Sequence, residues 1–244
     1  MRKFILAHEK LLLRALEILP GVVSWNIILF PYWGIFLFPT IVAYFILIFN
    51  IFWFYQSFQL AITATISHLR IQASMHYDWM QDVKGFPDWE KVNHIVVIPT
   101  FKEPIHILER TLNSLATQDL PKKMITVVLA MEAKEPETDR NEKVKILKSR
   151  FGKIFSNFYV TVNTLTSGEV VGKASNERYA AIWAKNELVN KKGLDINYLT
   201  ITSCDADHKY HPKHFAYLTF NFLDNPKRYN LFWQPAVMFY INIW

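Results

Sequence analysis

Uncharged, apolar residues fill much of the first third of this chain. Between residues 18 and 69 the sequence contains no Asp, Glu, Lys or Arg. A stretch of about fifty such residues can supply two membrane-spanning helices of roughly twenty residues each. Pro31 and Pro39 suggest where the stretch divides, so we expect spans within residues 21–38 and 40–62. The connection around residues 31–40 is short and uncharged, which predicts a tight helical hairpin.

The charges that flank this apolar stretch predict its orientation. Basic residues precede it at Arg2, Lys3, Lys10 and Arg14, and His68 and Arg70 follow it. Because basic flanks stay on the cytosolic side of a membrane, we expect both ends of the hairpin and the remaining chain in the cytosol. The protein would then be integral to the cell membrane. A secretory signal peptide is the alternative, but it needs only one apolar core of about 7–15 residues.

Residues 2–19 mix apolar and charged positions. This pattern fits an amphipathic helix along the cytosolic membrane face, and it equally fits the start of the first span. We therefore divide the chain into three parts. Residues 1–75 hold this segment and two transmembrane helices, residues 76–92 form a linker, and residues 93–244 form a cytosolic domain.

Beyond residue 88 the pattern changes to short β-branched runs that alternate with segments of helical period. The run at residues 94–98 stops at Pro99 and is typical of a buried strand. Apolar residues at positions 107, 108, 112 and 115 then recur with the spacing of a helix. The predicted strands are residues 94–98, 125–131, 157–162, 196–204 and a short one at 230–234. The predicted helices are residues 105–118, 138–151, 174–191 and 211–223.

Strands that alternate with helices predict an α/β domain with a doubly wound, mostly parallel sheet. Such sheets bind ligands beyond the carboxyl ends of their strands. Three groups of residues fall there: residues 99–103 after the first strand, Glu132 after the second, and Asp205-Ala206-Asp207 after the fourth. We expect these groups to converge on one site. The glycine-rich patterns of a dinucleotide site or a P-loop do not occur in the sequence.

Asp205 and Asp207 are the candidate metal ligands. Two carboxylates one residue apart at the end of a strand can hold a hard divalent cation such as Mg²⁺ or Mn²⁺. His208 and His211 follow closely and raise the alternative of a zinc site. Because zinc prefers nitrogen and sulfur ligands in tetrahedral sets of defined spacing, we favour Mg²⁺ or Mn²⁺.

Net charge and cysteine content narrow the possible partners. The formal net charge of +6 is explained by contact with an anionic lipid bilayer and an anionic substrate. Basic and aromatic residues are not interleaved in the way that indicates a nucleic-acid partner. The single cysteine, Cys204, excludes an intrachain disulfide, as suits a cytosolic domain.

The motifs, taken in chain order, resemble those of family 2 glycosyltransferases with the GT-A fold. Val97-Ile98-Pro99-Thr100-Phe101-Lys102-Glu103 is similar to the P-T-x-x-E opening of that family. A second strand ending in an acid, then Gly172-Lys173-Ala174-Ser175-Asn176 and Asp205-Ala206-Asp207, follow in the family's order. The charge-free hairpin before them is similar to that of membrane-integrated, cellulose-synthase-like members.

This resemblance implies an inverting transferase. It would move a sugar from a nucleotide-diphosphate donor, which we expect to be UDP-linked, to a lipid-linked or polysaccharide acceptor. Mg²⁺ or Mn²⁺ would neutralise the diphosphate leaving group, with Asp207 as a direct ligand. Asp205 would share the metal or contact the ribose or sugar of the donor. Lys173 would place its charge on the diphosphate, and Gly172 would allow a close backbone approach.

The same resemblance implies a nucleoside pocket. Pro99, Thr100 and Glu103 would line it, and Glu132 stands where the family usually has Asp, as a contact to the base or ribose. From the residues alone, Glu103 is equally an acid favoured by the dipole of the following helix. Asn176 matches a polar position of the family's Gly-Lys segment, and residues 233–236 resemble a wall of the donor or acceptor site.

These motifs do not include a general base for the transfer reaction. An inverting transferase needs a general base for the acceptor hydroxyl, and in the family this acid and a Q-x-x-R-W segment lie downstream. Neither is found before Trp244, so we expect an incomplete catalytic domain whose general base lies beyond Trp244. The alternatives are a short form that binds donor without turnover, a non-catalytic membrane scaffold, and a metal-dependent nucleotidyltransferase. The last needs a glycine-rich phosphate loop, and residues 100–104 contain no glycine.

Overall fold

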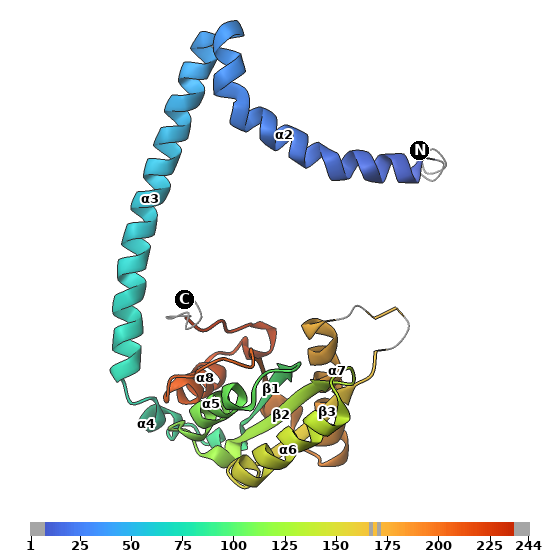
Figure 1. The fold of residues 1–244 in the computed structure, drawn as a ribbon. Helices are drawn as coiled ribbons and strands as arrows, with labels where there is room; N and C mark the ends of the chain where they lie inside the picture. The colour runs from blue at the N-terminus through green and yellow to red at the C-terminus, as the bar shows by residue number, and fades with distance from the viewer. Residues whose placement is uncertain (1–7, 166–167, 170–171, 237–244) are drawn as a thin grey trace. The chain divides into compact units, whose positions relative to one another are not determined.

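The computed structural model describes residues 8–165, 168–169 and 172–236, and the chain divides into two compact units. The first unit, Met1–Ser74, is built from two long helices, α2 (Glu9–Leu37) and α3 (Pro39–His76) (Figure 1). The second unit, Met75–Trp244, contains the sheet and the shorter helices. The basic positions Arg2 and Lys3 lie outside the described residues.

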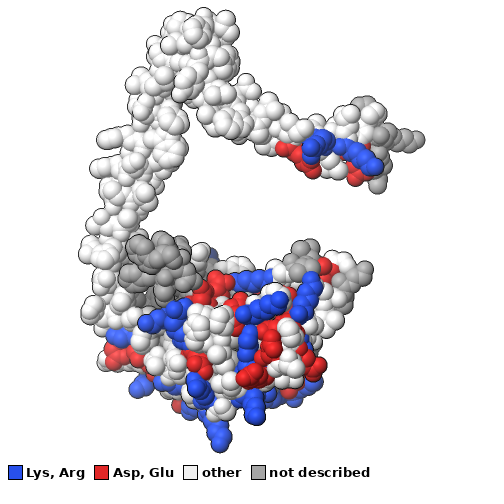
Figure 2. Space-filling model, in the orientation of Figure 1, with Lys and Arg blue, Asp and Glu red and all other residues white. Residues whose placement is uncertain are grey.

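Helices α2 and α3 are long and apolar enough to cross a membrane. Their 29 and 38 residues correspond to lengths of about 44 and 57 Å, against a hydrocarbon thickness of about 30 Å. Within the molecule, 0% of the most apolar 18-residue segment of α2 is buried, and 6% of the corresponding segment of α3. Figure 2 shows the corresponding uncharged stretch in white, whereas the second unit carries charges of both signs. These features indicate association with a membrane.

The two long helices meet at a single residue, Phe38. Pro39 begins α3, a position where the missing N–H of proline costs nothing. We expected the connection at residues 31–40, but Pro31 lies inside α2. The observed connection is therefore much shorter than the positions of the two prolines suggested. Residues 9–19 belong to the same helix as the first predicted span.

Gly34 allows the two helices to cross closely. A Cβ atom at this position would lie 2.7 Å from the Phe30 ring and 3.1 Å from Cγ2 of Val42 on α3. Val42 is buried by this crossing, with 2% of its surface exposed. The ring of Phe30 also packs edge-on against Phe45 of α3, with centroids 5.3 Å apart. The described contacts between α2 and α3 thus lie close to the residue that joins the two helices.

Four parallel strands form the sheet of the second unit. They are β1 (Asn93–Thr100), β2 (Ile125–Glu132), β3 (Asn157–Asn163) and β4 (Leu199–Ser203), in the order β3-β2-β1-β4. Every residue of the central strand β1 is buried, which is why it reads as a continuous β-branched run in the sequence. The predicted α/β class and parallel sheet are confirmed.

Helices cover both faces of the sheet (Figure 1). Helices α5 (Ile105–Ala116), α6 (Glu137–Phe151) and α8 (His214–Asp224) contribute to the larger core on one face. Helix α7 (Lys173–Lys185) covers the other face through Ala180 and Ala184. Small alanines let this helix approach the sheet closely, which brings its first turn beside the strand ends.

Some predicted boundaries differ from the structure. The fourth strand begins at Leu199 because residues 196–198 form the turn η4 (Ile196–Tyr198), in which the Asp195 carboxylate accepts from the Asn197 N–H at 2.9 Å. The last helix begins at His214, after residues that belong to the loop beyond β4. Helix α7 ends at Lys185, but the π-helix η3 (Asn186–Lys191) continues it to the predicted end at residue 191.

The predicted strand at residues 230–234 is wrong. Residues 228–230 form the turn η5 (Arg228–Asn230), and residues 231–236 have no regular structure. The Asn230 N–H donates to the Lys227 carbonyl at 2.9 Å, and the Lys227 N–H donates to the Asn225 side chain at 2.9 Å. These local bonds use backbone groups that a strand would need for a sheet partner.

The segment predicted as a linker contains helix α4 (Trp79–Val83) and the turn η1 (Trp89–Lys91). The Trp79 ring lies 4.5 Å from the Tyr217 ring and 5.2 Å from the Phe220 ring of α8, measured between centroids. Lys213 donates to the Tyr77 carbonyl at 2.9 Å. Residues 75–92 therefore pack as part of the second unit.

Candidate functional site

The strand order places a crevice between β1 and β4. The chain runs outward from β1 to β2 and β3, and then returns to place β4 on the other side of β1. Ligands of open α/β sheets bind where the strand order reverses in this way, and the helices that follow β1 and β4, α5 and α8, lie in the same core. The register pairs Val97 of β1 with Ser203 of β4, so the loops after these strands begin close together.

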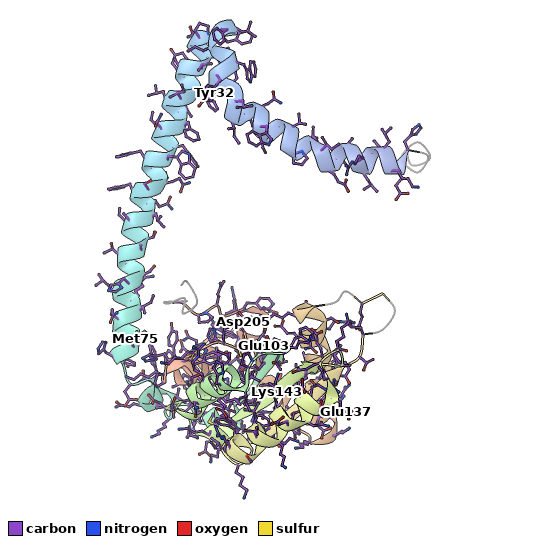
Figure 3. All side chains as sticks on the ribbon, in the orientation of Figure 1. Tyr32, Met75, Glu103, Glu137, Lys143 and Asp205 are labelled. Atoms are coloured by element: carbon purple, nitrogen blue, oxygen red, sulfur yellow. The ribbon has the colours of Figure 1, made fainter. Side chains whose placement is uncertain are left out.

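A cavity of about 690 Å³ opens at this switch point. Its lining residues are Pro99, Thr100, Phe101, Glu103, Ile107, Glu132, Gly172, Lys173, Asn176, Asp205, Ala206 and Asp207. These include all eight positions that the sequence predicted as donor or metal contacts. Figure 3 labels Glu103 and Asp205 at the same end of the sheet. A second cavity of about 260 Å³ shares Glu132 and Gly172 with the first.

The loop after β1 is shaped by Glu103. One carboxylate oxygen of Glu103 accepts from the Thr100 hydroxyl at 2.6 Å and from the Phe101 N–H. Lys102, which lies between Phe101 and Glu103 in the chain, has a φ of 63°, an uncommon conformation for a residue with a side chain. Helix α5 begins at Ile105, so Glu103 precedes its first turn. Glu103 therefore fixes the loop conformation at the cavity.

Helix α5 holds the loop after β4. Its residues bond to the backbone of that loop through Arg110–Asp207 O (3.3 Å), Thr111–Ala206 O (2.6 Å) and Ser114–Tyr210 N (3.2 Å). Gln118, just beyond the end of α5, adds bonds to His211 O (3.0 Å) and to Phe215 N at the start of α8 (3.1 Å). Positions 111 and 114 share one helix face. This role could not be predicted from the sequence, because polar residues on an amphipathic helix ordinarily face solvent. The bonds fix the backbone that carries Asp205 and Asp207.

Lys173 lies between two carboxylates at the start of α7. Its ammonium group contacts Oδ1 of Asp205 and lies 3.4 Å from Oε1 of Glu177. The Ser203 hydroxyl at the end of β4 donates to the same Glu177 oxygen at 2.7 Å. Gly172 precedes the helix with a φ of 143°, a conformation that favours glycine. Sequence reasoning did not single out Glu177, whose spacing of four residues from Lys173 was the available signal.

Burial and neighbouring charges set the protonation of these groups. Burial by itself lowers the pKa of Lys173, but the hydrogen bond and charge of Asp205, together with Glu177, outweigh it and leave this pKa raised. Lys173 is therefore cationic at neutral pH. Burial lowers the pKa of His208 against the opposing effect of the nearby Asp205 and Asp207 carboxylates. Burial also raises the pKa of the Cys204 thiol to about 11, so Cys204 stays a neutral thiol.

The donor atoms at the cavity suit Mg²⁺ or Mn²⁺. Asp205 and Asp207 both line it and offer hard carboxylate oxygens. Across the described residues, no group of three or more His, Cys, Asp or Glu side chains is placed to hold a metal ion. A tetrahedral zinc site needs such a set. Mg²⁺ is commonly bound by one or two carboxylates, with water and phosphate oxygens in the other positions.

Asn176 carries an unsatisfied polar atom at the cavity wall. Its amide donates to the Ala130 carbonyl at 2.8 Å, which anchors α7 to the sheet. Its Oδ1 atom is buried and has no hydrogen-bond partner within the described part of the chain. By contrast, Trp233 packs against the Phe222 ring with centroids 6.0 Å apart. Residues 233–236 are not among those that line either cavity.

The fold and site define an α/β domain with a ligand-sized cavity at the switch point of a parallel sheet, preceded by two long apolar helices. No family model matches this chain, and no curated protein matches it in sequence.

Proposed function

We propose that the α/β domain binds a nucleotide-diphosphate sugar, with UDP as the expected nucleotide, and serves transfer of the sugar to a lipid-linked or glycan acceptor. The observation that carries this proposal is the composition of the cavity at the β1–β4 switch point. Its lining includes Lys173, Asp205, Asp207 and Gly172, the residue that precedes α7. A diphosphate held through a divalent cation needs both a cationic side chain and carboxylate ligands for the metal.

The diphosphate would lie against the start of α7. The first N–H groups of a helix have no partners within the helix and favour an anion. Lys173, the first residue of α7, adds a full positive charge at the same place. A Cβ atom at Gly172 would meet none of the residues that the structure describes within 4 Å. The backbone at Gly172 is thus open to a ligand that approaches closely.

Asp205 and Asp207 would hold Mg²⁺ or Mn²⁺, which when bound neutralises charge on the diphosphate leaving group. The loop that carries them is fixed by α5, as the Thr111 bond to the Ala206 carbonyl at 2.6 Å illustrates. The protein therefore supplies a rigid backbone for the carboxylates before the ligand arrives. Rigid placement of metal ligands is what a binding site for charged groups requires.

The nucleoside would occupy the part of the cavity formed by the ends of β1 and β2. Pro99 and Thr100 line it from β1, and Glu132 lines it from β2. Glu132 also borders the second cavity, together with Asn163 of β3. The adjoining cavities provide separate space for a base and a ribose-diphosphate. Glu103 would act here by holding the loop after β1 rather than only through its own charge.

The two apolar helices support a membrane location for this reaction. We propose that α2 and α3 cross the bilayer as a hairpin and that the α/β unit faces the cytosol, where nucleotide sugars are held. A chain anchored in this way has direct access to a lipid-linked or membrane-bound glycan acceptor. We assign none of the described residues as the base that takes the proton of the acceptor hydroxyl.

The metal assignment predicts the effect of an Asp207→Asn substitution. The full chain in detergent micelles should bind UDP in a Mn²⁺-dependent manner, as measured by calorimetric titration. Loss of one carboxylate should weaken this binding by about tenfold or more, the range expected for a charged contact. Asp139→Asn, which changes an exposed acid on α6, is the matched control and should bind UDP as the unmodified chain does.

Two outcomes would count against the proposal in different ways. Absence of any UDP binding by the unmodified chain with Mn²⁺ would contradict the proposed function. Unchanged titration of Asp207→Asn would refute the metal assignment alone. Thermal unfolding of each variant shows whether a loss of binding reflects the site or the fold.

A further inference from the structure

Asp205 is already paired with a positive charge supplied by the protein itself. The ammonium group of Lys173 contacts its Oδ1 atom. The side chains of Lys173 and Asp205 are 49% and 66% exposed, and such exposed ion pairs contribute little to stability. The contact is therefore easy to break when a stronger partner for either group arrives.

Lys173 has a second carboxylate within reach. Oε1 of Glu177 lies 3.4 Å from the ammonium group, one helical turn along α7. Glu177 is held by the Ser203 hydroxyl at 2.7 Å. An ammonium group that leaves Asp205 thus keeps a fixed partner. Movement between the two positions requires only rotation of the lysine side chain.

A divalent cation and the ammonium group compete for the same carboxylate. Both are positive, and two cations at one carboxylate repel each other strongly. Binding of a metal ion at Asp205 is therefore favoured when Lys173 moves away from it. Lys173 lines the cavity together with Gly172, at the start of α7 where the phosphates of the ligand would lie.

We propose that Lys173 occupies Asp205 until a divalent cation and a diphosphate bind together, so that each ligand promotes binding of the other. The metal ion releases the ammonium group for the phosphates, and the phosphates draw it away from the metal ligand. The two effects must be equal in size, because coupling between two ligands is reciprocal. This inference rests on the proposed function and adds to it a means of holding the metal site closed without nucleotide.

The test compares Mn²⁺ binding by the full chain in detergent micelles with and without UDP, measured by calorimetric titration. In the unmodified chain, UDP should tighten Mn²⁺ binding, and Mn²⁺ should tighten UDP binding by the same factor. Lys173→Met frees Asp205, so it should bind Mn²⁺ alone about two- to fivefold more tightly, the range that an exposed ion pair supplies. The tightening produced by UDP should fall by a similar factor.

Lys191→Met is the matched control. Lys191 forms the same kind of pair four residues apart, with Oε2 of Glu187 at 2.9 Å, and it does not line the cavity. Its substitution should leave Mn²⁺ binding unchanged, both alone and with UDP. Lys173→Arg keeps a cation at the site and should also retain the weak binding of Mn²⁺ alone.

The outcomes separate this inference from the proposed function. Equal affinities of Lys173→Met and the unmodified chain for Mn²⁺ alone would overturn the inference. An undiminished effect of UDP in Lys173→Met would also overturn it, while leaving donor binding intact. Failure of the unmodified chain to bind UDP at all would overturn the proposed function and this inference with it.

Discussion

At the scale of single residues, His94 shows how one neutral side chain joins three elements. Its ring nitrogens lie 2.7 Å from the Thr200 hydroxyl of β4 and 2.8 Å from the Thr219 hydroxyl of α8. Thr219 donates its only hydroxyl proton to the Phe215 carbonyl at 2.7 Å. Thr219 must therefore accept from Nε2–H of His94, and Nδ1 accepts from Thr200. A second proton on the ring would break this arrangement.

This arrangement predicts that the domain loses stability in mild acid. Burial, reinforced by the charge of His214, lowers the pKa of His94 to about 3, and burial also lowers the pKa of His214 to about 4. The unfolded chain takes up these protons near pH 6.5, so the unfolded state binds more protons between this pH and the lowered values. The free energy of unfolding should fall as the pH drops below 6.5, by about 1.4 kcal/mol per pH unit for each histidine.

Urea unfolding of the full chain from pH 7.5 to pH 4.5 measures this slope. His94→Gln removes one titrating group, so its unfolding free energy should depend less steeply on pH, even where its stability at neutral pH is lower. His106→Gln, at an exposed position of α5, should keep the original slope. Equal slopes for His94→Gln and the unmodified chain would contradict the assignment.

Several cavity residues could be predicted from the sequence because they follow a strand, whereas Gly172 and Lys173 were predicted only from the resemblance to a family motif. Thr100, Glu132 and Asp205 stand at or just after ends of β-branched or apolar runs, and parallel strands bring such ends together. The pairing of Lys173 with Asp205 could not be predicted in the same way. It depends on how closely α7 approaches the sheet, which is decided by contacts between residues far apart in the chain.

At the scale of elements, α5 positions the loop after β4. This predicts that Thr111→Val weakens the site more than its conservative size suggests. The substitution removes the 2.6 Å bond to the Ala206 carbonyl and leaves a buried acceptor unpaired, which costs about 1–3 kcal/mol. Mn²⁺-dependent UDP binding should weaken in parallel, because the carboxylates on either side of Ala206 lose a fixed backbone.

Thr138→Val on α6 makes the same chemical change at an exposed position and serves as the control. Urea unfolding measures the stability of each variant, and calorimetric titration with UDP and Mn²⁺ measures the site. Equal effects of the two substitutions would show that α5 has no positioning role.

The sequence pattern predicts that α5 is a helix, but it does not predict which part of the chain packs against the polar side of α5. The spacing of Leu108, Leu112 and Leu115 identifies α5 as amphipathic, and all three are fully buried. The polar positions Thr111 and Ser114 look like a solvated face in the sequence. They are covered only because a loop about one hundred residues later folds over them, and local patterns carry no information about such a contact.

At the scale of the whole molecule, the chain joins an apolar helical unit to an α/β unit. The proposed hairpin predicts that both of its ends face the same side of the membrane. Lys10→Cys and Glu90→Cys should each react with a membrane-impermeant maleimide only from the cytosolic side of sealed vesicles. The native Cys204 is buried, so the unmodified chain provides the background. Labelling of the two positions from opposite sides would refute the hairpin.

The packing of the hairpin also sets an order of events during synthesis. Its contacts are local: Gly34 meets Val42, and Phe30 meets Phe45. The sheet, in contrast, pairs His94 with Thr200, a contact that closes only when the later strand has been made. Short-range contacts form faster than long-range ones, and domains near the N-terminus fold first on the ribosome. The proposed membrane anchor is therefore complete before the cavity exists.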